Sequence, residues 1–453
     1  MPSDALFGPS LSTELMMATV SDRAWVQAML DVEAALARAL AKEGLIPVEV
    51  AEDIAAHSRV GEFDVDQIGR EAVDSASPVV PLIKALRARV SKEAVPHVHR
   101  GATSQDILDT AMMVIARRAI DVLLKDLVEA AALAAWLADR HRATVMAGRT
   151  LLQHASVTTL GLKAAGWLIA ILEARDTLIG MRDFSLAVQL GGSVGTLAAL
   201  SDSGLKVMRN LAADLNLVSP RLPWHTDRTR VAHLGSVVAI AGGVAGKIAL
   251  DAVLLSQTEV DEARERPVAG RGGSSAMPHK KNPVAAVEIL AAVRGLNAQA
   301  GVLLGTMLQE HERAAGAWQA EWHAVSELFS LAGGATSRLA RLLASLEVDE
   351  ERMRKNLDVS GGLIMSEQVM MALAERTDTL TARRLVEAAI AKASESRRPF
   401  AEVLRVDPAI TAHLSGDDLA QALEPSNAIG ASSRLIDGAL GYYRATRKYK
   451  GVE

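Results

Sequence analysis

The sequence predicts an all-α protein, and three observations lead to that prediction. No proline occurs from His97 to Ser219 or from Val284 to Arg398, so two long stretches lack the residue that breaks helices. Both stretches are rich in Ala, Leu, Met, Glu and Arg, which favour helix. Alternation of apolar and polar residues, the pattern of a half-buried strand, is scarce throughout the chain.

The spacing of apolar residues predicts an early helix and then much longer ones. In the first part of the chain, apolar residues recur every three or four positions, at Trp25, Met29, Val32, Leu36 and Leu40. In the proline-free stretches a helix of about 35 residues would be about 50 Å long. A helix of that length needs neighbours along its whole length. We therefore expect a helix bundle, and one that extends between subunits.

Clusters of Pro, Gly and Ser mark where helices are expected to end. They lie at residues 75–81, 95–97, 218–223, 267–283 and 360–362. A chain of 453 residues suggests about three domains. We predict an N-terminal helical domain (1–110), a central long-helix bundle (111–360) and a C-terminal helical domain (361–453). The central domain carries a loop rich in Gly and Ser at residues 270–283.

Composition excludes several classes of protein. Apolar residues make up 49% and charged residues 23%, the balance of a globular protein with a large core. The absence of cysteine rules out disulfides, thiolate metal sites and cysteine nucleophiles. A net charge of −5 and 3% aromatic residues do not favour nucleic-acid binding. The N-terminus shows no secretion signal, and no membrane span is expected, so we predict a cytoplasmic protein.

Motifs for metals and cofactors are incomplete. His97 and His99 lack a third ligand at a suitable spacing. Residues 241–248 resemble a phosphate-binding loop only faintly, because Ile248 stands where Ser or Thr would bind magnesium. We expect that segment to be a helix with close backbone contacts, and we expect no metal and no cofactor.

The loop at residues 270–283 combines a flexible backbone with reactive groups. Its three glycines allow the backbone to close over a ligand, and Ser274, Ser275, Lys280 and Lys281 follow. A serine hydroxyl beside an ammonium group and backbone N–H groups can exchange a proton. By composition alone, a solvated linker explains the segment about equally well.

The order of the residues in that loop favours a catalytic interpretation. Gly273-Ser-Ser-Ala-Met-Pro-His-Lys-Lys-Asn282 resembles the signature loop of the fumarase/aspartase superfamily, G-S-S-x-M-P-x-K-x-N, at every specified position. Residues 99–111, with a T-S-x-D core, and residues 148–161 resemble the family's other two site regions in the expected order. Segments 310–313 and 361–367 extend the similarity over nearly the whole chain.

The resemblance implies a fold, an assembly and a reaction class. The family fold is all-α in three domains with a long central five-helix bundle. Four chains form a homotetramer with a twenty-helix core, and each active site collects the three regions from three subunits. The family reaction adds or eliminates a group next to the carboxylate of a small polycarboxylate substrate. A base exchanges the proton on carbon, and electrostatic donors stabilise the anion that forms.

The resemblance also implies roles for individual residues. The predicted catalytic residues are Ser274, which would exchange the carbon proton, and His154 and His99, either of which is an alternative proton donor. Lys280 and Asn282 would bind one substrate carboxylate, and Thr103, Ser104 and Gln105 a second one. Gln153, Ser275, Met277 and Arg313 complete the predicted substrate-binding set, with Arg149 as a weaker candidate. If residues 151–154 are helical, His154 shares a face with Leu151.

Two departures from the family pattern indicate the kind of leaving group. Leu151 stands where the hydrolyases and amine lyases have a histidine, and Val287 where that histidine has a glutamate partner. Such a pair helps to protonate a poor leaving group, whereas a carboxylate, with a pKa near ~4, needs no acid. Lactonisation of a muconate is that case. Segments 152–155, 310–322 and 356–365 also resemble the superfamily's 3-carboxy-cis,cis-muconate cycloisomerases, whose product is 4-carboxymuconolactone in protocatechuate breakdown, a branch of the beta-ketoadipate pathway.

Two other functions stay open on the sequence. An adenylosuccinate lyase-like C–N lyase has a similar loop, including Met-Pro-His-Lys, although Leu151 and Val287 speak against it. A catalytically inert structural homologue, as among lens crystallins, is the third alternative, since a sequence motif does not show turnover. The choice between a carboxylate and another anion, such as a sulfonate, at substrate position 3 is also open.

Overall fold

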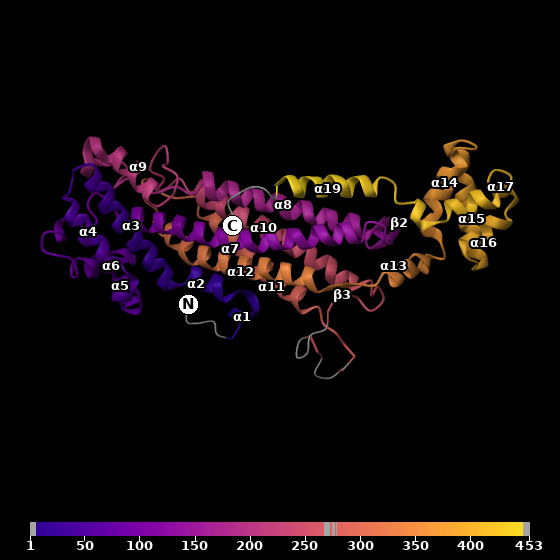
Figure 1. The fold of residues 1–453 in the computed structure, drawn as a ribbon, viewed down its shortest axis with the longest axis horizontal. Helices are drawn as coiled ribbons and strands as arrows, with labels where there is room; N and C mark the ends of the chain where they lie inside the picture. Colours follow the sequence, from indigo (N-terminus) through magenta and orange to yellow (C-terminus); the bar gives the residue numbers. More distant parts are fainter. Residues whose placement is uncertain (1–5, 267–271, 274–276, 278, 447–453) are drawn as a thin grey trace.

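Five long helices form an elongated central bundle, which confirms the predicted all-α fold (Figure 1). The computed structural model describes residues 6–266, 272–273, 277 and 279–446. The bundle helices are α7 (Ser104–Arg140), α8 (Leu160–Phe184), α10 (Thr229–Leu255), α11 (Val284–Gly305) and α12 (Ala317–Ser345). Four of the five lie in the two proline-free stretches, α10 lies between them, and the buried Ala, Leu, Ile and Val side chains of all five form one continuous core.

Small residues let the bundle helices approach one another closely. A Cβ atom at Gly242 of α10 would lie 2.0 Å from Cδ2 of Leu296 on α11. Gly246, one turn later, faces Val293 of the same helix. The segment that faintly resembled a phosphate-binding loop is therefore helical and tightly packed, as expected.

The N-terminal part of the chain covers one end of the bundle. It contains α1 (Gly8–Leu11), α2 (Glu14–Thr19), α3 (Asp22–Lys42), α4 (Val48–Ala56), α5 (Val65–Ser75) and α6 (Val79–Arg87). The apolar stripe predicted along residues 25–40 is buried on α3, which packs against α7 and α9 (Gly204–Asp214). Ser21 caps α3 by accepting a hydrogen bond from the Ala24 N–H. Helix α7 begins before the predicted domain boundary at 110/111 and runs across it.

Two short antiparallel sheets lie at the other end of the bundle. The first is the hairpin of β1 (Val145–Thr150) and β2 (Gln153–Thr159), between α7 and α8. The second pairs β3 (Ala263–Glu265) with β4 (Leu346–Val348). Strand β3 ends directly before the signature loop, so both sheets lie next to regions that the sequence singled out.

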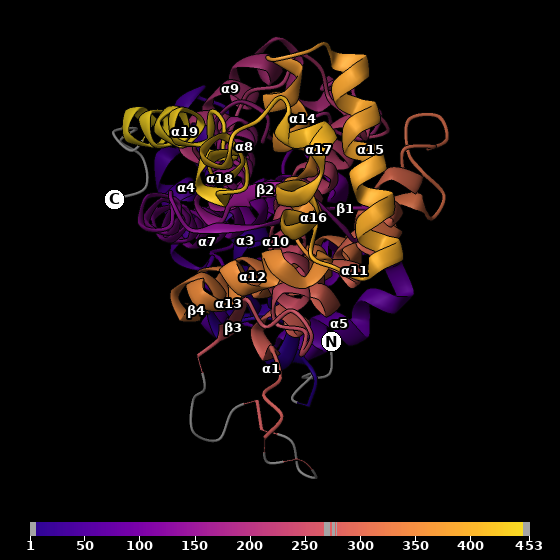
Figure 2. The same ribbon diagram turned by 90° about the vertical axis from the view of Figure 1, so that its right-hand side faces the viewer.

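The C-terminal part of the chain divides into two portions. Helices α14 (Ser366–Ala374), α15 (Thr379–Ser396), α16 (Phe400–Val406), α17 (Pro408–Thr411) and α18 (Gly416–Ala422) enclose a separate apolar cluster at the far end of the molecule (Figures 1 and 2). The last helix, α19 (Ser432–Thr446), returns along α8 and buries Ile436 and Leu440 in the bundle core. Helix α13 (Glu350–Asn356) joins the bundle to this region.

Two bundle helices carry more apolar surface than one chain covers. By length and composition alone, α10 and α11 could each cross a membrane. Only 50% of the most apolar window of α10 and 28% of that of α11 is buried in the described structure. Exposed side chains on them include Ile240 and Leu250 on α10 and Val302 and Leu304 on α11.

Candidate active site

The first predicted region forms the N-terminus of α7. The hydroxyl of Thr103 and the carboxylate of Asp106 form a capping box, in which Asp106 Oδ2 accepts the Thr103 N–H at 3.0 Å. Ser104 and Gln105 are the first two residues of the helix. Thr103, Ser104 and Gln105 are therefore held together at one helix terminus, whose free N–H groups favour an anion.

The Asp106 carboxylate connects this helix terminus to two distant segments of the chain. Besides the Thr103 N–H, its carboxylate accepts the N–H groups of Gly191 at 3.0 Å and Gly192 at 2.9 Å, and it lies 2.7 Å from Nε2 of His225. Both Asp106 and His225 are buried. The sequence reasoning missed His225, which is brought here from 119 positions away. No local sequence pattern predicts a contact between residues so far apart in the chain.

His99 lies next to this terminus and pairs with a residue that the motifs did not include. Its Nδ1 atom is 2.6 Å from Oε1 of Glu33, a carboxylate on α3 whose side chain is only 1% exposed. His99 has a left-handed backbone, with φ of 67°. Burial alone would lower the pKa of His99, but the Glu33 carboxylate outweighs burial and leaves the pKa raised. The Glu33 carboxylate therefore favours the protonated form of the imidazole.

Arg313 joins the same group from the segment before α12. Its Nη1 donates to Oε1 of Gln105 at 3.2 Å, and its Nη2 donates to the Ser193 carbonyl at 2.8 Å. Neither acceptor is charged, and no ion pair with a carboxylate is found for Arg313 among the described residues. A guanidinium held in this way retains the charge needed to bind an anionic ligand.

A buried ionic network supports the group from inside the bundle. The Arg228 guanidinium contacts both oxygens of Asp109, at 2.7 and 3.0 Å, and the carboxylate of Glu321. Trp318 Nε1 also donates to Asp109 Oδ1 at 3.0 Å. Gln105 Nε2 contacts Asp109 at 3.2 Å, so the network reaches the proposed substrate-binding amide. All three charged side chains are buried, and the one guanidinium is shared between two carboxylates.

The second predicted region is a β-hairpin, so the suggestion that residues 151–154 are helical is wrong. Thr150 pairs with Gln153, which leaves Leu151 and Leu152 as a two-residue turn. Both leucines have positive φ, 49° and 65°, where Asn or Gly is usual. Each left-handed residue of this kind costs roughly 1–2 kcal/mol. Leu151 and His154 therefore do not share a helix face.

Charged groups surround His154 at the base of this turn. Arg149, its cross-strand neighbour, donates through Nη1 and Nη2 to the two carboxylate oxygens of Glu262, at 2.9 and 2.6 Å. Burial and the Arg149 guanidinium lower the pKa of His154, which Glu262 only partly offsets. His154 is therefore neutral near neutral pH, in contrast to His99. Arg149, the weaker candidate, is engaged in an ion pair.

The third predicted region is described only in part. Ser274 and Ser275 lie outside the described residues. Asn282 N–H donates to the Gly272 carbonyl at 2.9 Å, and Gly273 forms an antiparallel bridge with Lys281, so the two sides of the loop meet at its base. The side chains of Met277 and Lys280 are exposed and that of Asn282 is half-buried.

The predicted site residues form two groups at opposite ends of one chain. Thr103, Gln105, His99 and Arg313 lie at the start of α7. The hairpin follows the end of α7, beyond 37 helical residues, which at 1.5 Å per residue correspond to about 55 Å. The signature loop leaves β3 near the hairpin end (Figure 1). One chain alone therefore does not bring the three regions together.

The two departures from the family pattern are both on the surface of the single chain. The side chain of Leu151 is 97% exposed at the hairpin tip, and that of Val287 is 53% exposed in the first turn of α11.

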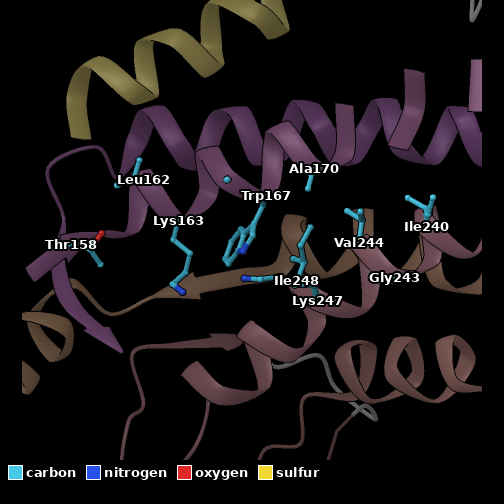
Figure 3. A pocket seen from close by; sticks show the side chains of 11 residues that line it. Thr158, Leu162, Lys163, Trp167, Ala170, Ile240, Gly243, Val244, Lys247 and Ile248 are labelled. Atoms are coloured by element: carbon cyan, nitrogen blue, oxygen red, sulfur yellow. The ribbon is translucent and has the colours of Figure 1, made fainter. Parts of the chain in front are cut away.

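A separate groove of about 670 Å³ runs along the bundle between α8 and α10 (Figure 3). Apolar residues dominate its lining, together with Lys163, Trp167 and Lys247. None of the predicted site residues lines it. Burial lowers the pKa of Lys163.

Comparison with known proteins identifies the family. A family model described as "Lyase" matches residues 10–299, and one described as "Adenylosuccinate lyase C-terminus" matches residues 362–439. The chain belongs to this lyase family. The fumarase/aspartase membership predicted from the signature loop is thereby confirmed.

Relatives of the lyase match it over almost their full length. A 3-carboxy-cis,cis-muconate cycloisomerase of Bradyrhizobium diazoefficiens is 45% identical over 96% of this chain and 97% of its own. A nitrosuccinate lyase of Streptomyces davaonensis is 43% identical over 96% of this chain and 94% of its own. The crystal structure of the 3-carboxy-cis,cis-muconate lactonizing enzyme from Pseudomonas putida superposes with a TM-score of 0.91 at 36% identity, covering 98% of this chain and 100% of that one.

Proposed function

We propose that this lyase converts 3-carboxy-cis,cis-muconate to 4-carboxymuconolactone. The observation that carries the proposal is the full-length similarity, at 45% identity, to a cycloisomerase of that name. Within the beta-ketoadipate pathway the step belongs to protocatechuate breakdown. We propose that it takes place in the cytoplasm, without metal or cofactor.

The reaction needs one proton and no acid for a leaving group. A carboxylate oxygen of the substrate forms a C–O bond to one carbon of a double bond, and the adjacent carbon takes a proton. In the reverse direction the carboxylate departs as an anion that is stable at neutral pH. Leu151 and Val287, in place of a histidine and its glutamate, fit a reaction of this kind.

We propose Ser274 and His99 as the two candidates for the proton donor. Ser274 is a candidate because it is the first serine after the glycine in the signature loop, the position to which the family resemblance assigns exchange of the carbon proton. His99 has support from the described geometry, because the Glu33 carboxylate contacts Nδ1 and raises the pKa of the imidazole, and Nε2 takes no part in that contact. His154 is the weaker donor, since its imidazole is neutral beside Arg149.

The substrate carries three carboxylates. Groups at the two ends of the chain are the binding sites for two of them. Thr103, Ser104 and Gln105 at the α7 terminus, with Arg313 beside them, bind one carboxylate. Lys280 and Asn282 of the loop bind another and stabilise the anion that forms during proton transfer. Gln153, Ser275 and Met277 line the remaining space.

We propose that the enzyme is a homotetramer whose active sites are shared between subunits. The two groups of site residues lie about 55 Å apart along α7, so a complete site requires a second chain. The incompletely buried apolar faces of α10 and α11, and the groove beside α8, provide the surface on which other subunits would pack.

A second candidate function is elimination of another weakly basic anion from a substituted succinate. The nitrosuccinate lyase at 43% identity favours this candidate, and nitrite, like a carboxylate, leaves without an acid. An adenylosuccinate lyase-like reaction has the weaker support of the matching C-terminal family model, and Leu151 and Val287 replace the pair that would protonate an amine.

An ultraviolet assay of the purified protein tests the proposal. Loss of the diene absorbance of 3-carboxy-cis,cis-muconate, with 2-nitrosuccinate and adenylosuccinate untouched, is the expected result. Release of nitrite from 2-nitrosuccinate without turnover of the muconate would select the second candidate. Inactivity toward all three would favour an inert homologue.

A further inference from the structure

Glu262 is a buried carboxylate that no sequence motif singled out. Its side chain is 0% exposed, and both of its oxygens accept from Arg149, at 2.9 and 2.6 Å. Oε1 also accepts from Nδ2 of Asn356 at 2.8 Å. A carboxylate placed in such surroundings and satisfied on both oxygens holds its partners in fixed positions.

The backbone of Glu262 is fixed on both sides as well. Its N–H donates to the Leu255 carbonyl at 2.9 Å, at the end of α10, and its carbonyl accepts the Asp349 N–H at 3.0 Å, just before α13. Glu262 is therefore held in place by the end of α10 and the start of α13. Its carboxylate in turn holds Arg149 of the hairpin.

The hairpin has a conformation that its own sequence does not favour. Leu151 and Leu152 occupy left-handed backbone at the turn, and the strand register shifts between Ala147 and Arg149. At the intervening Gly148, a Cβ would lie 2.8 Å from the Ser156 carbonyl oxygen. Strained turns of this kind persist where the surroundings determine them. The Arg149–Glu262 pair is the charged contact at the base of this turn.

Strand β3, which begins directly after Glu262, also anchors the signature loop. Three residues after Glu262, the carboxylate of Glu265 accepts the N–H groups of Ala285 at 3.1 Å and Ala286 at 3.0 Å, at the N-terminus of α11. Glu265 precedes the loop and α11 follows it, so this contact closes the loop at its base. Within one four-residue segment, Glu262 thus holds the hairpin and Glu265 holds the base of the signature loop.

We propose that Glu262 is a positioning residue for the cycloisomerase: through Arg149 it fixes the hairpin turn that presents Gln153 and His154. This proposal rests on the proposed function for its kinetic readout. Without the Glu262 charge, the Arg149 guanidinium loses its partner and the turn relaxes. A displacement of about 1 Å at a reacting group can cost 10²-fold in rate.

The test compares Glu262→Gln, Arg149→Gln and the double variant with the unmodified chain. We expect each single variant to lower kcat about 10- to 100-fold with a change in KM below about threefold. The double variant is expected to be no worse than the poorer single variant, because the two residues act as one unit. Amide hydrogen exchange of residues 145–159, measured without substrate, is expected to be faster in both single variants.

Several results would overturn the proposal. A folded Glu262→Gln variant with unchanged kcat would do so, as would effects that simply add in the double variant. If the unmodified chain does not turn over the muconate, the proposed function fails. The exchange measurement then still decides whether Glu262 holds the hairpin.

Asp407→Asn is the matched control for a general loss of stability. Asp407 is also a buried carboxylate, 5% exposed and 2.6 Å from Nζ of Lys392, but it lies in the separate C-terminal cluster. The control is expected to lower the thermal midpoint while leaving kcat and hairpin exchange unchanged. A loss of kcat equal to that of Glu262→Gln would show that the effect is not specific to the hairpin.

Discussion

The Nδ1 atom of His99 lies 2.6 Å from Oε1 of Glu33, so two residues 66 positions apart form one hydrogen-bonded pair. The histidine–glutamate pair that the signature regions lack at Leu151 and Val287 thus has a counterpart elsewhere in the chain. Here it raises the pKa of a histidine next to the proposed carboxylate-binding terminus of α7.

Replacing the partner of this histidine should move the pH dependence of activity. The groups that act on the His99 pKa are Glu33 on α3, Asp106 on α7 and Arg87 on α6. If protonated His99 is required, activity falls as pH rises through its raised pKa. Glu33→Gln removes the largest raising effect, so the alkaline limb of kcat/KM should move to lower pH. A profile from about pH 5 to 9 measures the shift, and an unmoved limb would exclude protonated His99 from the reaction.

Removing the loop hydroxyl should slow turnover strongly. We expect Ser274→Ala to lower kcat on the order of 10²–10⁴-fold, the usual value of a positioned proton donor. The corresponding His99→Asn variant provides the comparison. Near-normal turnover in Ser274→Ala together with a large loss in His99→Asn would assign the proton transfer to His99.

The half-buried carboxylate of Asp126 on α7 should destabilise the fold at neutral pH. Burial raises the pKa of Asp126 to about 6, and the hydrogen bond from Thr336 Oγ1 at 2.9 Å only partly opposes this. The folded state binds more protons than the unfolded state between about pH 4 and 6, so stability falls as pH rises through that window. Asp126→Asn should therefore raise the free energy of unfolding by about 1–3 kcal/mol near pH 8 and change it little near pH 4. Urea unfolding at both values checks this, and an equal effect at the two values would contradict it.

Glycine at the start of α8 should be irreplaceable. A Cβ at Gly161 would lie 2.7 Å from the Ala138 carbonyl oxygen, in the last turn of α7, and 2.6 Å from Cα of Arg142, just after that helix. Gly161→Ala should cost about 1–3 kcal/mol. Gly180→Ala on the same helix meets nothing within 4 Å and should stabilise by roughly 0.5–1 kcal/mol. Thermal unfolding of the two variants tests the contrast, and equal midpoints would show that the close approach is not limiting.

Mixed assemblies should recover activity that neither parent has. A His99→Asn chain retains the hairpin group, and a Gln153→Ala chain retains the α7 terminus. After joint refolding in equal amounts, about one quarter of shared sites would combine two intact groups. Light scattering should give a mass four times the 48.0 kDa chain. A monomer, or no recovery on mixing, would contradict the shared site.

The long helices were predictable because their causes are local. Proline absence and the three- or four-residue spacing on α3 act within a few turns, and both predictions are confirmed. The hairpin was missed because its turn contains Leu151 and Leu152, which carry no turn signal. The reason for a glycine at position 148 is visible only in the structure, where an added Cβ would lie 2.8 Å from the Ser156 carbonyl oxygen.

The residues that support the site were not predictable from one sequence. Glu33, His225 and Glu262 each reach their partners from 66, 119 and 113 positions away, so no spacing rule connects them. Burial of these charged groups is decided by tertiary packing. By contrast, Thr103 and Asp106 follow a local capping pattern, and the structure shows that they use it.

The path of the chain through its C-terminal helices limits how that region can turn. It leaves the bundle after α13 and returns as α19, so the cluster of α14–α18 is attached by two segments, 357–365 and 423–431. Two attachments restrict the turning of a body more than one attachment does. Ile364 and Met365, in the first attachment, pack with Val145 and Val157 of the hairpin. The first attachment of the cluster is therefore also in contact with the strands that carry Gln153 and His154.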